Sequence, residues 1–297
     1  MTSLPPITVL KGGISSEREV SLRSGAAVAA ALRSLGASVE ELDVTASDFA
    51  LPPVERFLFI GLHGTFGEDG QLQKRLEAEG RRYSGSGPES CRLAFDKLLA
   101  RERFIRAAVR VARGAAWSTE TSWSLPYVLK PVADGSSVGV SLVRMPAEEA
   151  GARAAALASG KRMMIEDLIQ GRELTVGLLD GEPLPVIEMR PKEGFYDYEN
   201  KYTPGRTEHL CPAPLTAAER NAVQDAAVKA YRAVDAAVYG RVDVILPADG
   251  SAPVVLELNS LPGMTDLSLL PEAAAAAGIP FPELCRRIVR LSLEARP

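Results

Sequence analysis

Two apolar stretches near the C-terminal end carry polar side chains at alternate positions, and this pattern constrains the fold more than any other. They are Arg241-Val-Asp243-Val-Ile and Val255-Leu-Glu257-Leu-Asn259. Because successive side chains of a strand point to opposite faces, the polar residues of each stretch share one face. If the two strands are neighbours in a sheet, Asp243, Glu257 and Asn259 form one cluster.

Such a cluster has a chemical use. Carboxylate and amide oxygens suit Mg²⁺, which also keeps ligand positions for phosphate oxygens, and Arg241 on the same face could meet developing negative charge. The alternative is a half-exposed strand pair with solvated charges, but each polar residue interrupts Val, Ile and Leu neighbours. The chain has two histidines, His63 and His209, too few for a histidine-rich metal site, so oxygen ligands are expected.

A second motif, Lys130-Pro-Val-Ala-Asp-Gly135-Ser136-Ser137-Val-Gly139, has the composition of a phosphate-binding loop. A lysine ends an apolar strand, and small residues follow whose backbone N–H groups can approach an anion closely. An ordinary hairpin with a flanking lysine has the same composition, so the motif is weak by itself. Gly-Lys followed by Ser or Thr never occurs, and Gly85-Ser-Gly87 lacks the third glycine of a dinucleotide fingerprint, which disfavours two common nucleotide folds.

Length and charge limit the possible partners. A chain of 297 residues accommodates two or three domains of roughly 100–200 residues each. The net charge of −4 argues against a broad nucleic-acid or anionic-membrane surface. No uncharged apolar run reaches the ~18 residues needed to span a bilayer, so we expect a cytoplasmic protein. Cys91, Cys211 and Cys285 lie far apart without CxxC spacing, which indicates neither a disulfide framework nor a zinc site.

The first part of the chain alternates between strand and helix patterns. Apolar runs at 7–10 and 56–62 flank a helical pattern from 21 to 35, which predicts a small parallel sheet. Residues 70–80 are expected to form a helix with a glycine stop, and Pro88 is expected to begin a helix that reaches about Ala108.

Three domains are expected: residues 1–88, 89–168 and 169–297. Within the central domain, strand, glycine-rich loop, strand, helix and strand follow in quick order from Tyr127 to Glu166, which suits a compact α+β unit with an antiparallel element. Residues 192–214 are crowded with Lys, Tyr, Gly and Pro, as is typical of a mobile lid or binding loop.

Several charged residues can each be interpreted either as part of a site or as ordinary structural or solvated side chains. Glu17 follows the Gly12-Gly13 turn and could hold a cationic amine, although charged residues there more often favour the start of a helix. His63, at a strand end, has the same status. Lys97 in a basic helix and Lys201-Tyr202 in a polar loop would by default be solvated.

Taken in order along nearly the whole chain, the motifs resemble those of the D-alanine:D-alanine ligases, members of the ATP-grasp superfamily. The resemblance rests on Gly12-Gly-x-Ser-x-Glu17-Arg-Glu-Val-Ser21, Leu62-His-Gly64, Gly67-Glu-Asp-Gly70, Ser84-Gly-Ser-Gly87, Asp96-Lys97, Lys130-Pro131, Gly135-Ser-Ser-Val-Gly139, Phe195-Tyr-Asp-Tyr198, Lys201-Tyr202, Gly240-Arg-Val-Asp243, Glu257-Leu-Asn259 and Pro262-Gly-Met264. It implies α/β and α+β structure in a three-domain ATP-grasp architecture, with an N-terminal parallel-sheet domain that precedes the ATP-grasp domains.

The resemblance also implies a reaction. Two D-alanine molecules would be ligated to D-alanyl-D-alanine through an acyl phosphate, for peptidoglycan precursor synthesis and cell-wall biogenesis. ATP and two Mg²⁺ ions, or Mn²⁺, would be the cofactors, and the chain would be a cytoplasmic homodimer without nucleic-acid or membrane partners.

Roles for individual residues follow from the resemblance. For the nucleotide, the implied residues are Lys97 and Lys130 at the phosphates, Lys201 at the γ-phosphate, Glu166 at the adenine amino group and Glu173 at the ribose, with Ser137 as a further cofactor-binding residue. The implied Mg²⁺ ligands are Asp243, Glu257 and Asn259. For the substrates, the implied set is Glu17 at the first ammonium group, linked through Ser136 to Tyr202; His63 beside the first D-alanine; Ser268 and Leu269 at the second carboxylate; and Arg241 with the N–H of Gly263 at the oxyanion.

Two departures from the family pattern stand out. The stretch Arg103–Pro126 is shorter than is common, and Asp167 follows Glu166 where many relatives carry a basic residue; either could change nucleotide affinity or choice. The Lys201-Tyr202 pair resembles relatives that make the dipeptide. The alternatives are an ATP-grasp ligase that uses another amino or hydroxy acid such as D-lactate, and a non-catalytic ATP-binding module.

Overall fold

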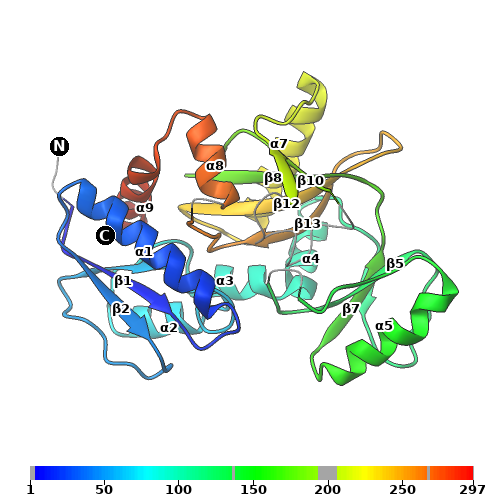
Figure 1. Cartoon of the computed structure of the whole chain (residues 1–297), viewed down its shortest axis with the longest axis horizontal. Coiled ribbons are helices and arrows are strands. Elements are labelled where there is room, and N and C mark those ends of the chain that lie inside the picture. The colour runs from blue at the N-terminus through cyan, green and yellow to red at the C-terminus, as the bar shows by residue number, and fades with distance from the viewer. Residues whose placement is uncertain (1–3, 136–137, 193–205, 266–267, 297) are drawn as a thin grey trace.

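The computed structural model describes residues 4–135, 138–192, 206–265 and 268–296. It contains a three-stranded, a four-stranded and a six-stranded sheet. In Figure 1 the three-stranded sheet lies at the left, the four-stranded sheet at the right, and the six-stranded sheet between and above them. Of the expected site residues, Ser136, Ser137, Lys201 and Tyr202 lie outside the described residues.

The N-terminal sheet has the parallel pairing that the alternation of elements predicts. Its central strand β1 (Ile7–Gly12) pairs with β2 (Val39–Val44) on one side and β3 (Phe57–Ile60) on the other, both parallel. The helices of this part are α1 (Arg18–Ser34) and α2 (Gln71–Ala78). Strand β2 was not predicted, because its sequence Val-Glu-Glu-Leu-Asp-Val carries three acids and gives little apolar signal.

The prediction of a single helix from Pro88 to about Ala108 is wrong. The chain forms α3 (Pro88–Phe95) and α4 (Lys97–Arg106), separated by Asp96 in an extended conformation (φ −86°, ψ 104°). The Asp96 carboxylate accepts hydrogen bonds from the N–H groups of Leu98 and Leu99, so it caps the second helix. Lys97 therefore begins a helix, and its N–H donates to the carbonyl of Val132 at 2.9 Å.

The four-stranded sheet is antiparallel, as expected for the central region. Its order is β4 (Gly114–Ala116), β7 (Met163–Asp167), β5 (Tyr127–Pro131) and β6 (Ser141–Val143). Helix α5 (Pro146–Ala158) covers one face, where Ala152 and Ala156 pack with Tyr127, Leu129 and Ile165 in a small separate core.

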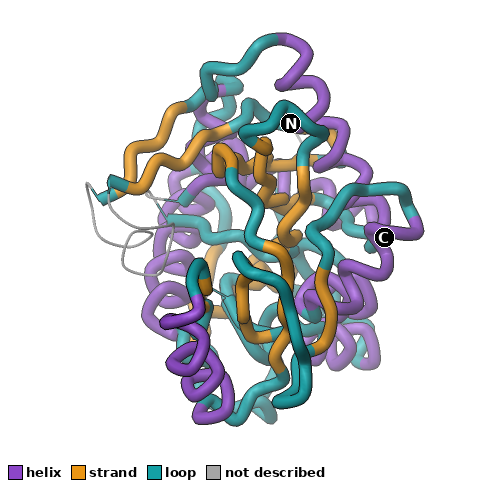
Figure 2. Tube along the Cα trace, turned by 90° about the vertical axis from the view of Figure 1, so that its right-hand side faces the viewer, coloured by secondary structure: helices purple, strands orange, loops and turns teal. Residues whose placement is uncertain are grey.

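The six-stranded sheet carries the polar strand pair. Its order is β11 (Thr207–Leu210), β10 (Ile187–Pro191), β8 (Gly171–Leu179), β12 (Tyr239–Pro247) and β13 (Val254–Asn259), with β9 (Glu182–Pro183) paired to β8. Strand β11 falls inside the stretch 192–214 that was expected to be a loop. In Figure 2 the strands run through the middle of the molecule with helices at its sides.

Two cores cover the two faces of this sheet. Helix α7 (Ala217–Ala233) packs on Val242, Val244 and Leu258. On the other side, α8 (Leu269–Ala276) and α9 (Phe281–Ala295) share one continuous core with the N-terminal sheet. No helix in the described part of the chain has the length and apolar character that crossing a membrane requires.

The C-terminal end of α9 is fastened to the N-terminal part of the chain by Arg296. Its guanidinium lies 4.1 Å from the ring centroid of Tyr83 and donates to the carbonyl of Gly85 at 2.8 Å. Ser292, one turn earlier, accepts the N–H of Gly85 at 3.2 Å. These contacts join segments that are about two hundred positions apart in sequence.

We expect Arg296→Ala to lower the free energy of unfolding by about 1–2 kcal/mol, because it removes a cation–π contact and a hydrogen bond. At roughly 2–4 °C per kcal/mol, the melting temperature should fall by a few degrees in differential scanning fluorimetry. The matched control is Arg290→Ala on the same helix, since Arg290 is exposed and has no hydrogen bond or ion pair with the described residues. Equal losses in both variants would contradict a role for the Tyr83 contact.

Candidate active site

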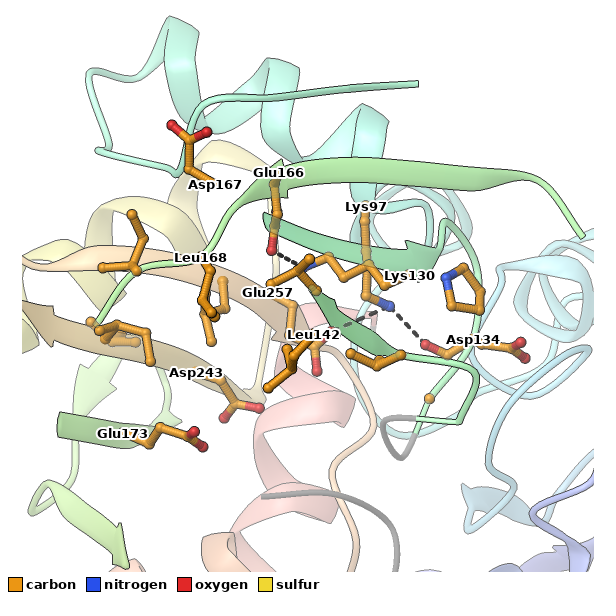
Figure 3. A pocket seen from close by; sticks show the side chains of 18 of the residues that line it. Lys97, Lys130, Asp134, Leu142, Glu166, Asp167, Leu168, Glu173, Asp243 and Glu257 are labelled. Carbon is orange, nitrogen blue, oxygen red and sulfur yellow. Dashed lines mark hydrogen bonds and ion pairs between the residues drawn. The ribbon is translucent and has the colours of Figure 1, made fainter. Parts of the chain in front are cut away.

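A cavity lies between the four-stranded and six-stranded sheets (Figure 3). Strands β5 and β7 contribute to it on one side, and β8, β12 and β13 on the other. Its charged lining residues are Lys97, Lys130, Asp134, Glu166, Asp167, Glu173, Asp243 and Glu257, and its apolar lining includes Leu142, Leu168, Ile169, Met189 and Leu256. An apolar wall beside a charged region suits a ligand with a flat base and anionic groups.

Lys130 and Glu166 form a buried ion pair inside this cavity. They stand on the neighbouring strands β5 and β7, each only 7% exposed, with Lys130 Nζ 2.5 Å from Glu166 Oε1. The resemblance assigns Lys130 to the phosphates and Glu166 to the adenine, whereas here they are bound to each other. Removing either partner would leave a buried, unpaired charge, which is costly.

Lys97 connects the phosphate-loop motif with the polar strand pair. Its Nζ donates to the carbonyl of Asp134 at 2.7 Å and lies 3.2 Å from Glu257 Oε2 (Figure 3). The capped start of α4 at Asp96 therefore brings the lysine to a point where the two sheets meet. Its default interpretation as a solvated side chain is wrong, since Lys97 is mostly buried.

Strands β12 and β13 are antiparallel neighbours, as the sequence predicts. Arg241 lies opposite Asn259 and Asp243 opposite Glu257. The Asp243 carboxylate accepts two hydrogen bonds from Arg241, at 2.9 and 2.8 Å, and a long one from Asn259 at 3.4 Å. The polar cluster therefore forms, with Asp243 at its centre.

Thr175 is a member of this cluster that sequence reasoning missed. It is 1% exposed on β8, directly opposite Asp243, and its hydroxyl donates to Asp243 Oδ1 at 2.6 Å. No signal in the sequence gives the register of β8 against β12. Within the described residues, no three His, Cys, Asp or Glu side chains are grouped to hold a metal ion, so an oxygen site here would need the amide of Asn259.

Glu17 lies at the junction of the N-terminal part and the phosphate loop. A Cβ atom added at Gly135 would lie 2.8 Å from Glu17 Oε2, and one at Gly64 would lie 2.9 Å from the same oxygen. Gly64 also has a φ of +71°, which side chains rarely adopt. Two glycine backbones therefore allow the Glu17 carboxylate to sit between two segments of the chain.

A buried hydrogen-bonded chain runs through His63, which is 6% exposed. Its Nδ1 lies 3.0 Å from Glu68 Oε1 and its Nε2 lies 3.1 Å from Ser24 Oγ, which also accepts the N–H of Met264 at 3.3 Å. Burial lowers the pKa of His63, but the hydrogen bond and charge of Glu68 outweigh it and raise the pKa above its ordinary value. This series of hydrogen bonds connects α1 to the loop that contains Gly263.

Ser24 and Glu68 were not expected in the site. Glu68 belongs to the Gly67-Glu-Asp-Gly70 motif and Ser24 follows the Glu17 motif, but neither motif indicates which polar groups will meet. Glu68 also borders a small cavity together with Lys97, Glu257 and Asn259, so it lies close to the polar strand pair.

Gly263, Ser268 and Leu269 lie together at the start of α8. Ser268 precedes the helix, and its Oγ accepts the N–H of Thr265 at 2.9 Å. A Cβ atom at Gly263 would be 2.7 Å from Ser268 Oγ, so the two residues are in close contact. Helix N-termini favour anions, which suits the carboxylate expected at this position.

A cavity between two antiparallel sheets, lined by two lysines and by an oxygen-rich strand pair, fits the ATP-grasp ligase class that the motifs resemble. The family model of the D-ala D-ala ligase C-terminus matches residues 102–290. The D-alanine–D-alanine ligases of Methylacidiphilum infernorum and Geotalea uraniireducens are each 44% identical to this chain, over 96% and 95% of it and 95% and 94% of their own lengths. The chain belongs to the D-alanine–D-alanine ligase family, as its motifs indicated.

Solved structures agree over the whole chain. The D-alanine–D-alanine ligase from Bacillus anthracis complexed with ATP has a TM-score of 0.84 at 31% sequence identity and covers 99% of both chains. Another crystal structure of that ligase has a TM-score of 0.85 and covers 98% of both. The expected ATP-grasp architecture is therefore confirmed.

Gly135→Ala should reduce kcat/KM at least ~10-fold, because the added methyl group would push the Glu17 carboxylate, the end of a flexible side chain, out of its position. Steady-state kinetics of ADP formation measures this. Gly151→Ala is the matched control, since a Cβ at this glycine of α5 meets nothing within 4 Å. Full activity in Gly135→Ala would show that close packing at Glu17 is dispensable.

Proposed function

We propose that this chain ligates two D-alanine molecules to D-alanyl-D-alanine for peptidoglycan precursor synthesis. ATP is cleaved to ADP and phosphate, and the first D-alanine passes through an acyl phosphate. The observation that carries the proposal is the similarity over essentially the full length of D-alanine–D-alanine ligases, together with a cavity that is lined by two lysines and by Asp243 and Glu257.

ATP occupies the cavity between the two larger sheets in this proposal. Lys97 and Lys130 contact its phosphates, Glu166 contacts the adenine amino group, and Glu173 the ribose. The support is that all four side chains line the cavity and that its remaining wall is largely apolar. The roles given to Ser137 and Lys201 stay predictions, because these residues lie outside the described ranges.

Two Mg²⁺ ions, or Mn²⁺, are proposed at Asp243, Glu257 and Asn259. The donor set fits, since hard cations prefer carboxylate and amide oxygens. Each acid is at present offset by a cation of the chain, Asp243 by Arg241 and Glu257 by Lys97. A bound metal would take over this compensation and leave Lys97 available for a phosphate. When bound, the ions offset charge on ATP and on the transferring phosphoryl group.

The reacting groups are proposed to meet beneath the phosphates. Glu17 holds the ammonium group of the first D-alanine, with His63 beside it, and Arg241 with the N–H of Gly263 stabilises the oxyanion formed when the second amine attacks. Ser268 and the Leu269 backbone hold the second carboxylate. The bond from Met264 to Ser24 supports this assignment, because it anchors the residue after Gly263. Ser136 and Tyr202, proposed to link to Glu17, lie outside the described residues.

The domain division and the assembly are also proposals. We propose domains at 1–88, 89–168 and 169–297, for which the separate core of the four-stranded sheet gives support. A homodimer and a cytoplasmic location rest on the family resemblance and the sequence alone.

The test is ADP release measured together with product mass, with ATP and Mg²⁺ and with D-alanine, L-alanine, or D-alanine plus D-lactate. We expect ADP and D-alanyl-D-alanine in equal amounts from D-alanine alone, and no product from L-alanine. Mainly ester product at neutral pH would instead identify a hydroxy-acid ligase, and nucleotide binding without turnover on any substrate would identify a non-catalytic module.

The same assay tests the metal site. Turnover should vanish when EDTA removes the divalent ion and return when Mg²⁺ is added in excess. Asp243→Asn should raise the Mg²⁺ concentration needed for half-maximal rate at least ~10-fold, since it removes one ligand charge. Glu283→Gln on α9, which lies outside the site, should leave that concentration unchanged. Undiminished turnover in EDTA would contradict the proposed metal site.

A further inference from the structure

Asp167, the last residue of β7, is held from outside the nucleotide cavity by two side chains. Arg113 Nε lies 3.2 and 3.1 Å from the two carboxylate oxygens, and Arg113 Nη2 lies 2.9 Å from Oδ1. The indole N–H of Trp123 donates to the same Oδ1 at 2.8 Å. The Arg113 guanidinium lies 4.5 Å from the centroid of the Trp123 ring. We call Arg113, Trp123 and Asp167 the clamp.

Backbone hydrogen bonds connect the same two segments, the stretch that contains Arg113 and Trp123 and the end of β7. The N–H of Asp167 donates to the carbonyl of Arg113 at 2.8 Å, and the N–H of Leu168 donates to the carbonyl of Pro126 at 3.2 Å. The segment 113–126 is therefore bound to the end of β7 through both backbone and side chains. These contacts bring together the two departures from the family pattern, the short stretch before Pro126 and the acid at position 167.

The residues that follow the clamp form a wall of the cavity. Residues 166–169 all line it, and in Figure 3 Glu166 and Leu168 lie along it while the Asp167 carboxylate points away from Lys130 and Glu166. In this view Lys97 and Asp134 lie to the right of Asp167 and Leu168. The clamp thus acts behind the wall at the end remote from Lys97, where apolar side chains suit the nucleotide base.

The geometry makes this contact stronger than an ordinary surface ion pair. Arg113 is 61% exposed and Asp167 33% exposed in their side chains, and a simple pair so exposed contributes little. Here the pair is bidentate, the carboxylate has a third donor, and the guanidinium stacks on an indole. The hydrogen bond from Arg113 lowers the pKa of Asp167, so the carboxylate stays charged at neutral pH.

We propose that Asp167 is a positioning residue for the nucleotide base: through Arg113 and Trp123 it fixes the wall 166–169 and thereby sets nucleotide affinity without touching the nucleotide. The inference rests on the proposed function for the location of the ATP site. It assigns the clamp no part in binding D-alanine or in the chemical steps.

The test is the dissociation constant of ADP with Mg²⁺, measured by isothermal titration calorimetry in the absence of D-alanine. Asp167→Asn and Trp123→Phe should each weaken ADP binding by about 3- to 10-fold, because the first removes the charge of the clamp at constant side-chain size and the second removes the indole N–H donor. In steady-state kinetics KM for ATP should rise by a similar factor, with kcat and KM for D-alanine unchanged. Trp123→Phe keeps an aromatic ring beside Arg113, so it provides a second test if Asp167→Asn misfolds.

The matched control is Glu283→Gln, which breaks surface ion pairs with Arg286 and Arg287 on α9 and should not alter ADP binding. Unchanged ADP affinity in both clamp variants would overturn the inference. A fall in kcat or a rise in KM for D-alanine in proportion to KM for ATP would overturn it too, because it would indicate general loosening. Wild-type protein that binds ADP but makes no dipeptide would overturn the proposed ligation and leave the clamp intact.

Discussion

The site depends on the register in which β12 and β13 pair. A slip by one residue would turn a strand's polar side chains to the opposite face, because side chains alternate along a strand. Burial prevents that slip: Val242, Val244 and Leu258 pack beneath α7 on the other face. A bulge between Asp243 and Val244 lets Asp243 stand opposite Glu257 while Val244 stands opposite Val255. The apolar half of the pattern thus fixes the position of the polar half.

Charge compensation explains how so many ionisable groups share one cavity. Lys130 offsets Glu166, Arg241 offsets Asp243 and Lys97 offsets Glu257, so each acid named here is paired within the chain. Buried charges are tolerated only when they are paired in this way. Lys130 and Glu166 stand on neighbouring strands of one sheet and Arg241 and Asp243 on a single strand, whereas Lys97 of α4 reaches Glu257 of β13 in another part of the fold. Under the proposed function, bound metal ions would offset Asp243 and Glu257 in place of Arg241 and Lys97.

Much of this could be read from the sequence, within physical limits. Alternation gave the polar strand pair and the parallel sheet, and a chain of short motifs gave the family. The break at Asp96, the acid-rich β2 and the strand β11 were missed, because capping and pairing outweighed a weak or misleading apolar pattern. Thr175, Ser24 and Glu68 were missed because the register of β8 and the approach of distant loops are tertiary facts. The contact between Arg113, Trp123 and Asp167 brings together two departures from the family pattern, the short stretch before Pro126 and the acid at position 167. The sequence shows these two departures only separately.

The central claim is that the carboxylate of the first D-alanine attacks the γ-phosphate of ATP and is thereby activated as an acyl phosphate. Transfer of an oxygen isotope to the released phosphate tests this claim most directly. D-alanine carrying ¹⁸O in both carboxylate oxygens is turned over with unlabelled ATP, and the released phosphate is analysed by mass spectrometry. A carboxylate oxygen forms the bond to phosphorus, and attack of the second amine on the carbonyl carbon breaks the bond between that carbon and the oxygen. The account predicts one ¹⁸O atom in each phosphate formed with dipeptide. Dipeptide formed alongside unlabelled phosphate would contradict it.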